Sequence, residues 1–215
     1  MGKAANSSIS LKQIHVTDNF WNKYVHLVKD VIIPYQWDIL NDKLEDVETS
    51  HCIENFKIAA GEKEGEFQGA VFQDTDVAKW LEAVGFVLNY ERDEKLEELA
   101  DETIELIGRA QQPDGYLNTY FTIKEPDGRW SNLMEGHELY TAGHMIEAAV
   151  AYYEATGKRR FLEIVSKFAD LVCQTFGPEE GKIHGYPGHQ EIELALVKLY
   201  RVTREKNIWI WQNIS

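Results

Sequence analysis

The sequence predicts an all-α protein whose helices form hairpins in a toroid or a solenoid. Apolar side chains recur at intervals of three and four residues in about seven stretches, and no strand-like alternation competes with them. Hydrophobic residues make up 44% of the 215 residues, which is enough for a packed core. Two Gly-His pairs, at His137 and His189, begin two of the predicted helices and lie 52 residues apart. That distance is about one hairpin with a long loop, so we expect both imidazoles at the same end of the bundle.

The first two predicted helices are short. Apolar residues recur at helical spacing after a Thr17-Asp18 cap, and Pro34 is expected to end this helix because proline has no N–H to donate. A second helix is predicted over 50–60, where Gly61 stops it. The apolar residues of the first helix are Phe20, Tyr24, Leu27, Val28 and Val31.

A longer hairpin follows in the middle of the chain. Its first helix carries an apolar stripe from Val77 to Leu88 and is capped by Thr75 or Asp76. Its second helix carries a stripe from Leu96 to Ala110 and ends at the Pro-Asp-Gly turn over 113–115.

The last predicted helices are separated by two long loops. Residues 116–135 have no period and are rich in aromatic and turn-forming residues, and a loop of that length in a compact domain is usually functional. Helices over 139–153 and 161–172 form the next hairpin. The loop 177–188 carries four glycines and two prolines and leads into a helix over 192–200.

The charge balance argues against several classes of partner. With 22 basic and 36 acidic residues the formal net charge is −14, so we expect no nucleic acid and no anionic membrane as a partner. Cys52 and Cys173 lie in apolar stretches typical of core thiols, and so few cysteines favour a reducing compartment. No signal-peptide core and no membrane-spanning run is found. We therefore expect a cytoplasmic protein.

His137 and His189 are the leading candidates for ligand binding. A single histidine at such a place is more often a helix cap or a core residue bonded to a backbone carbonyl. Two in equivalent positions, each after a glycine that lets a ligand approach the backbone, favour a polar pocket for a small hydroxylated molecule. His144 shares a helical face with His137 and is either a supporting residue or a core residue.

Carboxylates near helix starts are weaker candidates. Asp76 is expected to cap its helix, which leaves Asp74 free to point into the pocket. Glu138, Glu191 and Glu193 lie where the helix dipole favours acidic residues in any case.

Aromatic residues and metal ligands complete the candidates. Trp80 and Trp130 are candidates to stack on a sugar ring, although Trp80 is rather expected in the core. No metal site is predicted in this chain, because its one loose set of histidines matches no known ligand spacing. That set is His137, His144, His184 and His189.

The last nine residues, 207–215, break the helical pattern. Two tryptophans alternate there without forming a helical face, where the second helix of a hairpin is expected. Back-translated one base out of register, 206–214 yields a string that aligns with 160–167 and contains no stop codon. We therefore expect 207–215 to be an aberrant tail produced by a frameshift near Lys206, the alternative being a genuine C-terminal extension.

Several motifs together resemble the N-terminal part of glycoside hydrolase family 127, which is typified by β-L-arabinofuranosidase. The resemblance implies that 1–206 is the N-terminal part of an (α/α)6 barrel catalytic domain, incomplete in this chain. The motifs that carry it are 33–37 (IPYQW), 71–82 (VFQDTDVAKWLE), 112–117 (QPDGYL), 136–144 (GHELYTAGH), 177–185 (GPEEGKIHG) and 188–196 (GHQEIELAL).

The resemblance also implies a reaction, the retaining hydrolysis of glycans or oligosaccharides that contain L-arabinofuranose. His137 and His189 would bind hydroxyls of the sugar, with Asp74 as a further binding residue. Most retaining glycosidases use two carboxylates, but in this family a zinc-bound cysteine thiolate is the nucleophile and a glutamate is the acid/base. Those groups lie downstream of this chain, and neither Cys52 nor Cys173 falls in a matching motif. We therefore expect no catalytic residue and no zinc ligand here, and an inactive polypeptide.

Two other interpretations stay open. Another (α/α)6 carbohydrate-active enzyme would share the toroid but not the Gly-His-Glu-Leu-Tyr string, and a helical-repeat interaction protein would show a shorter, more regular period. An incomplete barrel leaves apolar helix faces uncovered, from which we expect a homo-oligomer or aggregation.

Overall fold

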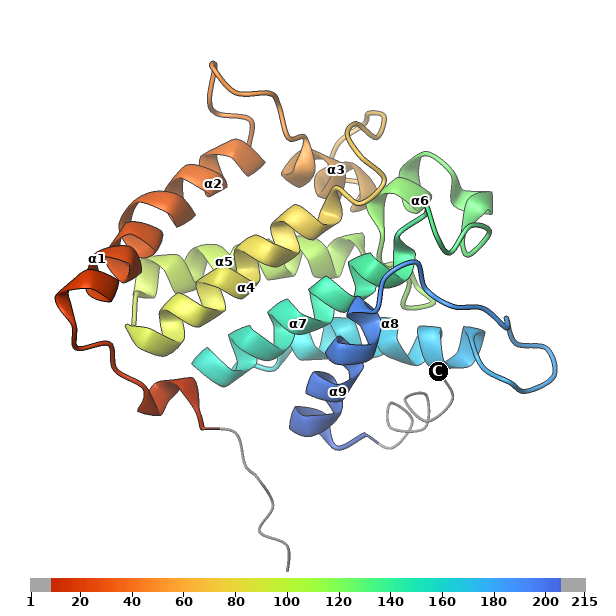
Figure 1. Ribbon diagram of the computed structural model, residues 1–215. Coiled ribbons are helices and arrows are strands. Elements are labelled where there is room, and N and C mark those ends of the chain that lie inside the picture. Colours follow the sequence, from red (N-terminus) through yellow and green to blue (C-terminus); the bar gives the residue numbers. More distant parts are fainter. Residues whose placement is uncertain (1–8, 206–215) are drawn as a thin grey trace, which may run out of the picture.

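The computed structural model describes residues 9–205, and these are all-helical, with one isolated bridge between Phe176 and Ile183 (Figure 1). The predicted fold class is confirmed. The described residues form nine α-helices rather than about seven, because α2 continues from α1 and a short α6 lies in a predicted loop. The predicted tail 207–215 lies outside these residues. The helices are α1 (Asn19–Leu27), α2 (Ile33–Leu40), α3 (Cys52–Ala59), α4 (Asp74–Tyr90), α5 (Glu94–Ala110), α6 (Thr119–Ile123), α7 (Glu138–Thr156), α8 (Arg160–Thr175) and α9 (Glu191–Thr203).

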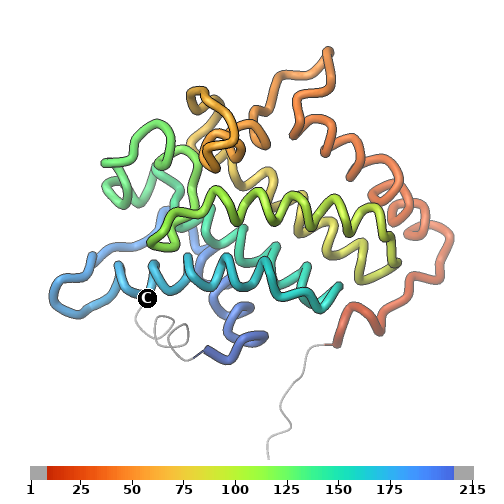
Figure 2. Tube along the Cα trace, turned by 180° about the vertical axis from the view of Figure 1, so that it is seen from behind, coloured from red at the N-terminus to blue at the C-terminus, as the bar shows by residue number. Residues whose placement is uncertain are grey.

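The long helices form two layers. In Figure 1, α4 and α7 run side by side in the same direction, with α9 beside α7, while the view from behind places α5 and α8 in the other layer (Figure 2). Each front helix turns back into its rear partner through a short connection, α4 into α5 and α7 into α8. The predicted hairpins are therefore present. The N-terminal ends of α7 and α9, called their heads below, lie at the same end of the front layer.

The middle of the core is α7, whose side chains are buried on nearly every face. A helix that is apolar all round has to be enclosed by neighbours. Gly85 of α4 lets this happen, because a Cβ at that position would lie 2.9 Å from the Ala151 carbonyl carbon of α7. The rear helices α5 and α8 bury a single face each, as expected for helices that contact solvent.

The first helix differs from the prediction at Pro34. Asp18 caps α1 as expected and accepts hydrogen bonds from the N–H groups of Phe20 (3.0 Å) and Trp21 (2.8 Å). Pro34 does not end the helix, however, because a π-helical turn over Val28–Ile32 joins α1 to α2. In this wide turn the Ile33 N–H bonds the carbonyl five residues back, and Pro34 takes the start of the next helix, where its missing N–H is not needed.

The apolar residues of α1 lie on the surface rather than in the core. Phe20 and Trp21 are each 60% exposed, and Val31 in the wide turn is 54% exposed. No element within 9–205 covers this face, which is the kind of uncovered surface from which association is expected. None of the helices in the described range is long and apolar enough to cross a bilayer.

The start of α4 also differs from the prediction. The helix begins at Asp74 and has Gln73 at the cap position, so neither Thr75 nor Asp76 is its cap. The Gln73 side chain accepts a hydrogen bond from the Ala70 N–H (3.1 Å) and donates one to Asp76 (3.0 Å). It thereby ties the preceding turn to the helix.

Candidate functional site

The head of α7 presents His137 in a left-handed backbone conformation, with φ 53° and ψ 20°. Its Nδ1 lies 2.7 Å from the Glu135 carbonyl oxygen. Because a carbonyl only accepts, Nδ1 carries the proton, and Nε2 of the neutral ring remains an acceptor. A non-glycine residue in this region of backbone space is uncommon and is typical of functional sites.

Buried contacts of Glu138 hold this head in place. Glu138 is 1% exposed, and its carboxylate accepts hydrogen bonds from the Tyr116 hydroxyl and from the Trp130 N–H, the latter at 2.7 Å. Burial raises the pKa of Glu138 to about 7, although the hydrogen bonds and Arg129 oppose the shift. The aromatic loop 116–135 thus folds around one carboxyl group, and His137 is fixed directly beside it.

The head of α9 brings His189 to the same place. The ring centroids of His137 and His189 lie 5.2 Å apart, and His189 lies 4.8 Å from the ring of Tyr140. The prediction that the two Gly-His pairs present their imidazoles together is confirmed. Unlike His137, His189 is exposed and has no left-handed backbone.

The two glycines have a packing role that the sequence did not predict. A Cβ on Gly136 would lie 2.7 Å from the Asn132 carbonyl oxygen, and a Cβ on Gly188 would lie 2.6 Å from the Met134 carbonyl oxygen. Both glycines therefore allow the backbone to approach the loop 131–135, and a ligand is not needed to explain them. The Gly188 N–H also bonds the Leu133 carbonyl at 3.2 Å, which joins the two heads.

Aromatic rings and one lysine extend the histidine pair. Phe72 is 42% exposed and lies 5.1 Å from the ring of His137. Tyr140 lies 4.5 Å from His144 and accepts a hydrogen bond from Lys79 Nζ at 3.2 Å. The exposed aromatic side chain beside the histidines is therefore Phe72, which sequence reasoning missed.

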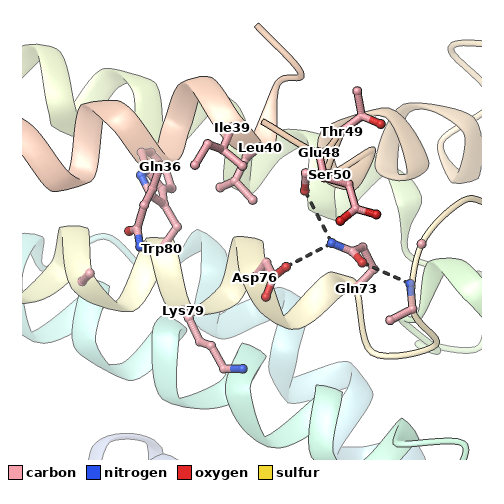
Figure 3. Close-up of a pocket in the computed structure, with 13 residues that line it drawn as sticks. Gln36, Ile39, Leu40, Glu48, Thr49, Ser50, Gln73, Asp76, Lys79 and Trp80 are labelled. Carbon is pink, nitrogen blue, oxygen red and sulfur yellow. Dashed lines mark hydrogen bonds between the residues drawn. The ribbon is translucent and has the colours of Figure 1, made fainter. Parts of the chain in front are cut away.

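A pocket of about 820 Å³ lies between α2, α4 and the segments 48–50 and 69–73 (Figure 3). Pockets of this size accommodate small ligands. Neither His137 nor His189 lines it, but Lys79 does, and Figure 3 shows this side chain extending from α4 toward α7. Its polar lining residues are Gln36, Glu48, Thr49, Ser50, Gln73, Asp76 and Lys79.

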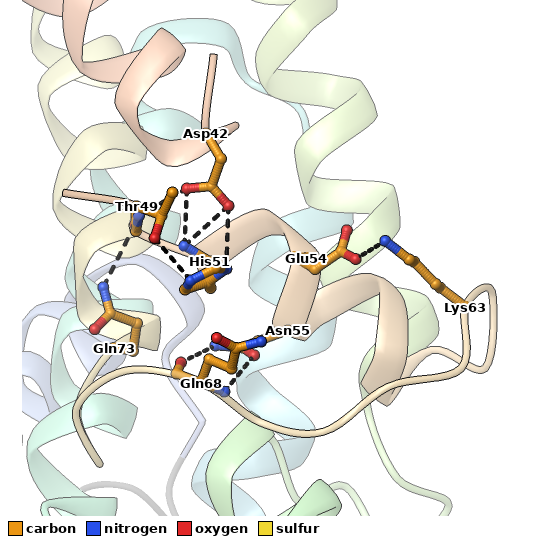
Figure 4. Close-up of polar contacts among 9 residues, drawn as sticks. Asp42, Thr49, His51, Glu54, Asn55, Lys63, Gln68 and Gln73 are labelled. Carbon is orange, nitrogen blue, oxygen red and sulfur yellow. Dashed lines mark hydrogen bonds and ion pairs between the residues drawn. The ribbon is translucent and has the colours of Figure 1, made fainter. Parts of the chain in front are cut away.

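Hydrogen bonds fix the loop wall of this pocket (Figure 4). Asp42 accepts the N–H groups of Ser50 (2.7 Å) and His51 (3.0 Å), which closes the loop before α3. Asn55 exchanges two hydrogen bonds with the Gln68 backbone, at 2.8 and 3.2 Å, and so fixes the return toward α4. These contacts join residues well separated in sequence, so no local motif predicts the pocket.

Asp74 occupies a structural position. Its side chain is buried and accepts two hydrogen bonds from Thr119, from the N–H at 2.7 Å and from the hydroxyl at 2.5 Å. Burial raises the pKa of Asp74 to about 6. The predicted free carboxylate is thus engaged with α6, and its role toward a ligand stays a prediction.

The tryptophan and cysteine candidates lie in the core or beside it. Trp80 is buried as expected and donates to the Ile33 carbonyl at 3.0 Å. Trp130 forms T-shaped pairs with Tyr116 and Phe176 in the packing of the loop, and its stacking on a sugar stays a prediction. The Cys52 thiol is buried, and burial raises its pKa.

One group of side chains within 9–205 has donors close enough together for a cation. Donor atoms of His144, Glu147 and Glu191 lie within 4.8 Å of one another, although Lys198 already pairs with Glu147. The group contains no sulfur, so it does not fit the cysteine-containing zinc centre that the resemblance implies. The four histidines considered from the sequence do not form a ligand group among these residues. Zinc in this protein therefore stays a prediction.

Comparison with known proteins identifies the family. The family model described as "Beta-L-arabinofuranosidase, GH127 catalytic domain" matches residues 13–212. The chain belongs to this family. The resemblance predicted from the sequence motifs is thus confirmed, and the family is one of glycoside hydrolases.

Individual relatives agree with this family. A non-reducing end β-L-arabinofuranosidase of Bifidobacterium longum subsp. longum is 46% identical over 209 residues, which cover 90% of this chain and 32% of the relative. The crystal structure of a GH127 β-L-arabinofuranosidase from Geobacillus stearothermophilus T6 is 62% identical with a TM-score of 0.92, covering 94% of this chain and 32% of that one. A GH127 β-arabinofuranosidase of known structure is 36% identical with a TM-score of 0.87, covering 95% and 33%. The chain therefore spans about a third of the length of these relatives.

Proposed function

We propose that this protein is a glycoside hydrolase of the β-L-arabinofuranosidase type, acting with retention on L-arabinose-containing glycans or oligosaccharides. Residues 9–205 would supply one side of the sugar site. The convergence of the His137 and His189 rings at 5.2 Å carries this proposal. Family membership and the similarity to the two arabinofuranosidases described above support it.

The chemistry of the histidine pair suits a sugar. The Glu135 carbonyl holds the proton on Nδ1 of His137, so Nε2 accepts a hydrogen bond from a hydroxyl group. His189 adds a second imidazole, and Phe72 offers an exposed apolar ring of the kind that packs against sugar C–H groups. We propose that these side chains bind and orient the furanose while the groups that break the bond are absent from 1–215.

A binding titration with L-arabinose tests the sugar site. We expect chemical-shift changes at the His137 and His189 ring protons and a Kd on the order of 1 mM. Replacing either histidine with alanine removes one hydrogen bond and weakens binding by about tenfold. The control is His184→Ala, which changes an exposed histidine in the loop that leads to His189. Equal binding by all variants, or no binding at all, would contradict the proposed site.

A turnover assay tests the second half of the proposal. The 215-residue polypeptide is expected to give no hydrolysis of p-nitrophenyl β-L-arabinofuranoside above background. Measurable hydrolysis that His137→Ala abolishes would show that the chain holds catalytic groups of its own, and would overturn that half while leaving the sugar site intact.

A further inference from the structure

A carboxyl cluster lies close to His189 in the chain, where the first turn of α9 meets α7. Glu191 is the first residue of α9 and follows His189 by two positions. Gly143 of α7 allows the close approach, because a Cβ there would lie 2.6 Å from Glu191 Cγ and 3.0 Å from the Ile192 nitrogen. The head of α9 therefore contacts α7 through Glu191, two residues after His189.

The cluster holds more negative than positive groups. Lys198 pairs with Glu147, which is 7% exposed, so this cation is already engaged. His144 Nδ1 lies 3.5 Å from Glu191 Oε1, but burial lowers the pKa of His144 to about 4 and the ring is neutral at pH 7. The titratable groups that face the cluster are Lys79 and Glu82 from α4, His144 and Glu147 from α7, and His189, Glu191 and Lys198 from the α9 segment.

The ligand atoms of Glu191, Glu147 and His144 lie within 4.8 Å of one another, so Glu191 faces a second carboxyl group and a neutral imidazole. Burial and the neighbouring Glu147 raise the pKa of Glu191 to about 7. Two buried carboxylates this close cannot both ionise at low cost, and one proton between them would replace repulsion with a hydrogen bond. Lys79 offers no relief, because its ammonium group is directed to Thr75 and Tyr140.

We infer that Glu191 is a positioning residue for His189, and that a proton shared between Glu191 and Glu147 fixes the head of α9 on α7. With the proton present, the two carboxyl groups bond each other and His189 lies beside His137. When the proton leaves to solvent, two like charges face each other across the Gly143 contact, and the head of α9 moves away. This inference rests on the proposed sugar-binding role of His189.

The test compares wild type with Glu191→Gln between pH 6 and pH 8, using L-arabinose binding and thermal unfolding. At pH 8, one unit above the pKa, about one tenth of the pairs hold the proton, so the wild-type Kd rises about tenfold. Because the Glu191 pKa is raised in the folded state, its contribution to stability is present at low pH and is lost as pH rises through about 7. We expect the wild-type Tm to fall by about 2–4 °C over this range.

The conservative variant separates positioning from bulk stability. Glutamine keeps a hydrogen bond to Glu147 without a charge, so Glu191→Gln should bind at pH 8 about as tightly as wild type does at pH 6. Glu193→Gln, on the same turn but exposed, is the matched control and should keep the wild-type pH response. The difference between the two variants isolates this carboxyl group from every other titrating group.

Three outcomes would overturn the inference. In the first, Glu191→Gln keeps the full wild-type pH response, and in the second it loses binding and stability equally at every pH. In the third, Zn²⁺ or Mn²⁺ raises the Tm of wild type but not of Glu191→Gln, which would make the cluster a cation site instead. If no variant binds L-arabinose while the His189 ring resonances and the Tm still respond to pH through Glu191, the proposed function fails and the proton pair stands.

Discussion

The heads of α7 and α9 present the same Gly-His motif to the same place, but they are built differently. At the α7 head, Glu138 and Tyr116 are buried and bonded, and His137 is held in a left-handed conformation. At the α9 head, Tyr186 is 81% exposed and His189 is exposed as well. One imidazole is therefore preorganised by the core, while the other depends on a few contacts at the base of its loop. Equal motifs in a sequence do not imply equal rigidity.

The largest effect is expected when a tyrosine is removed beside each head, Tyr116 at α7 or Tyr186 at α9. Tyr116→Ala leaves a cavity and deprives Glu138 of its donor, so we expect a loss of about 3–5 kcal/mol in the free energy of unfolding. Tyr186→Ala removes an exposed ring and should change that free energy by less than about 0.5 kcal/mol. Urea unfolding of both variants measures the comparison, and similar losses would show that the α9 loop is packed as firmly as the α7 loop.

The pH dependence of stability separates the two heads next. The pKa of Glu138 is raised to about 7 in the folded state, so its contribution is present at acid pH and is lost as pH rises through 7. We expect about 2 kcal/mol less stability at pH 8.5 than at pH 5.5 from this group, because only the roughly 1.5 pH units below its pKa contribute. In urea titrations at several pH values, the free energy of unfolding of Glu138→Gln should fall less steeply with pH than that of wild type. The part of the pH dependence that is due to Glu191 should remain. If the free energy of unfolding changes with pH in this variant as it does in wild type, Glu138 does not contribute to the pH dependence.

A single methyl group tests the contact between the heads. Gly143→Ala places a Cβ against the α9 backbone, which has to shift, and should destabilise the fold by about 1–3 kcal/mol. Gly108→Ala is the matched control on α5, because its Cβ would meet the ends of the flexible Arg160 and Ile164 side chains. There the better helix propensity of alanine should leave the Tm equal or higher. Equal Tm changes in the two variants would argue against a tight contact at Gly143.

The smallest effect concerns backbone strain at the two histidines. His137→Gly should have a free energy of unfolding about 1 kcal/mol higher than that of His137→Ala, since alanine is strained in the left-handed region. At position 189 the order should be reversed. His189→Ala should be more stable than His189→Gly by up to about 1 kcal/mol, because glycine loses more backbone entropy on folding. Thermal unfolding of the four variants gives both differences. Alanine being the more stable residue at both positions would mean that the α7 head stores no strain.

Sequence patterns predicted most of the helices because these depend on local information. The apolar periods of α4, α5, α7 and α8 and the cap at Asp18 are readable within a few residues of each element. The error at Pro34 arose because a proline signals a helix end only where the preceding turn is regular, and here it is wide. The aromatic loop 116–135 was recognised as unusual, but its organisation around Glu138 depends on contacts that no local window contains.

The candidate site was predictable in part. The repeat spacing of His137 and His189 predicted their convergence, because equivalent ends of successive hairpins meet in space. The spacing held no information on Asp74, whose partner Thr119 lies 45 residues away in the chain. The pocket beside α4 was missed for the same reason, since its wall is made by loops that meet only in the folded chain.

The wide turn over Val28–Ile32 has a consequence for how the pocket tolerates change. One extra residue in a helical turn advances the phase of everything after it by about 100°. Trp37 therefore stacks on Trp80 with ring centroids 4.5 Å apart, and Gln36 lines the pocket, only at this count of residues. Deleting one residue from the turn would rotate α2 and replace that face with another. Chain length at this point is thus more strictly constrained than residue identity, and insertions and deletions here should be far more damaging than substitutions.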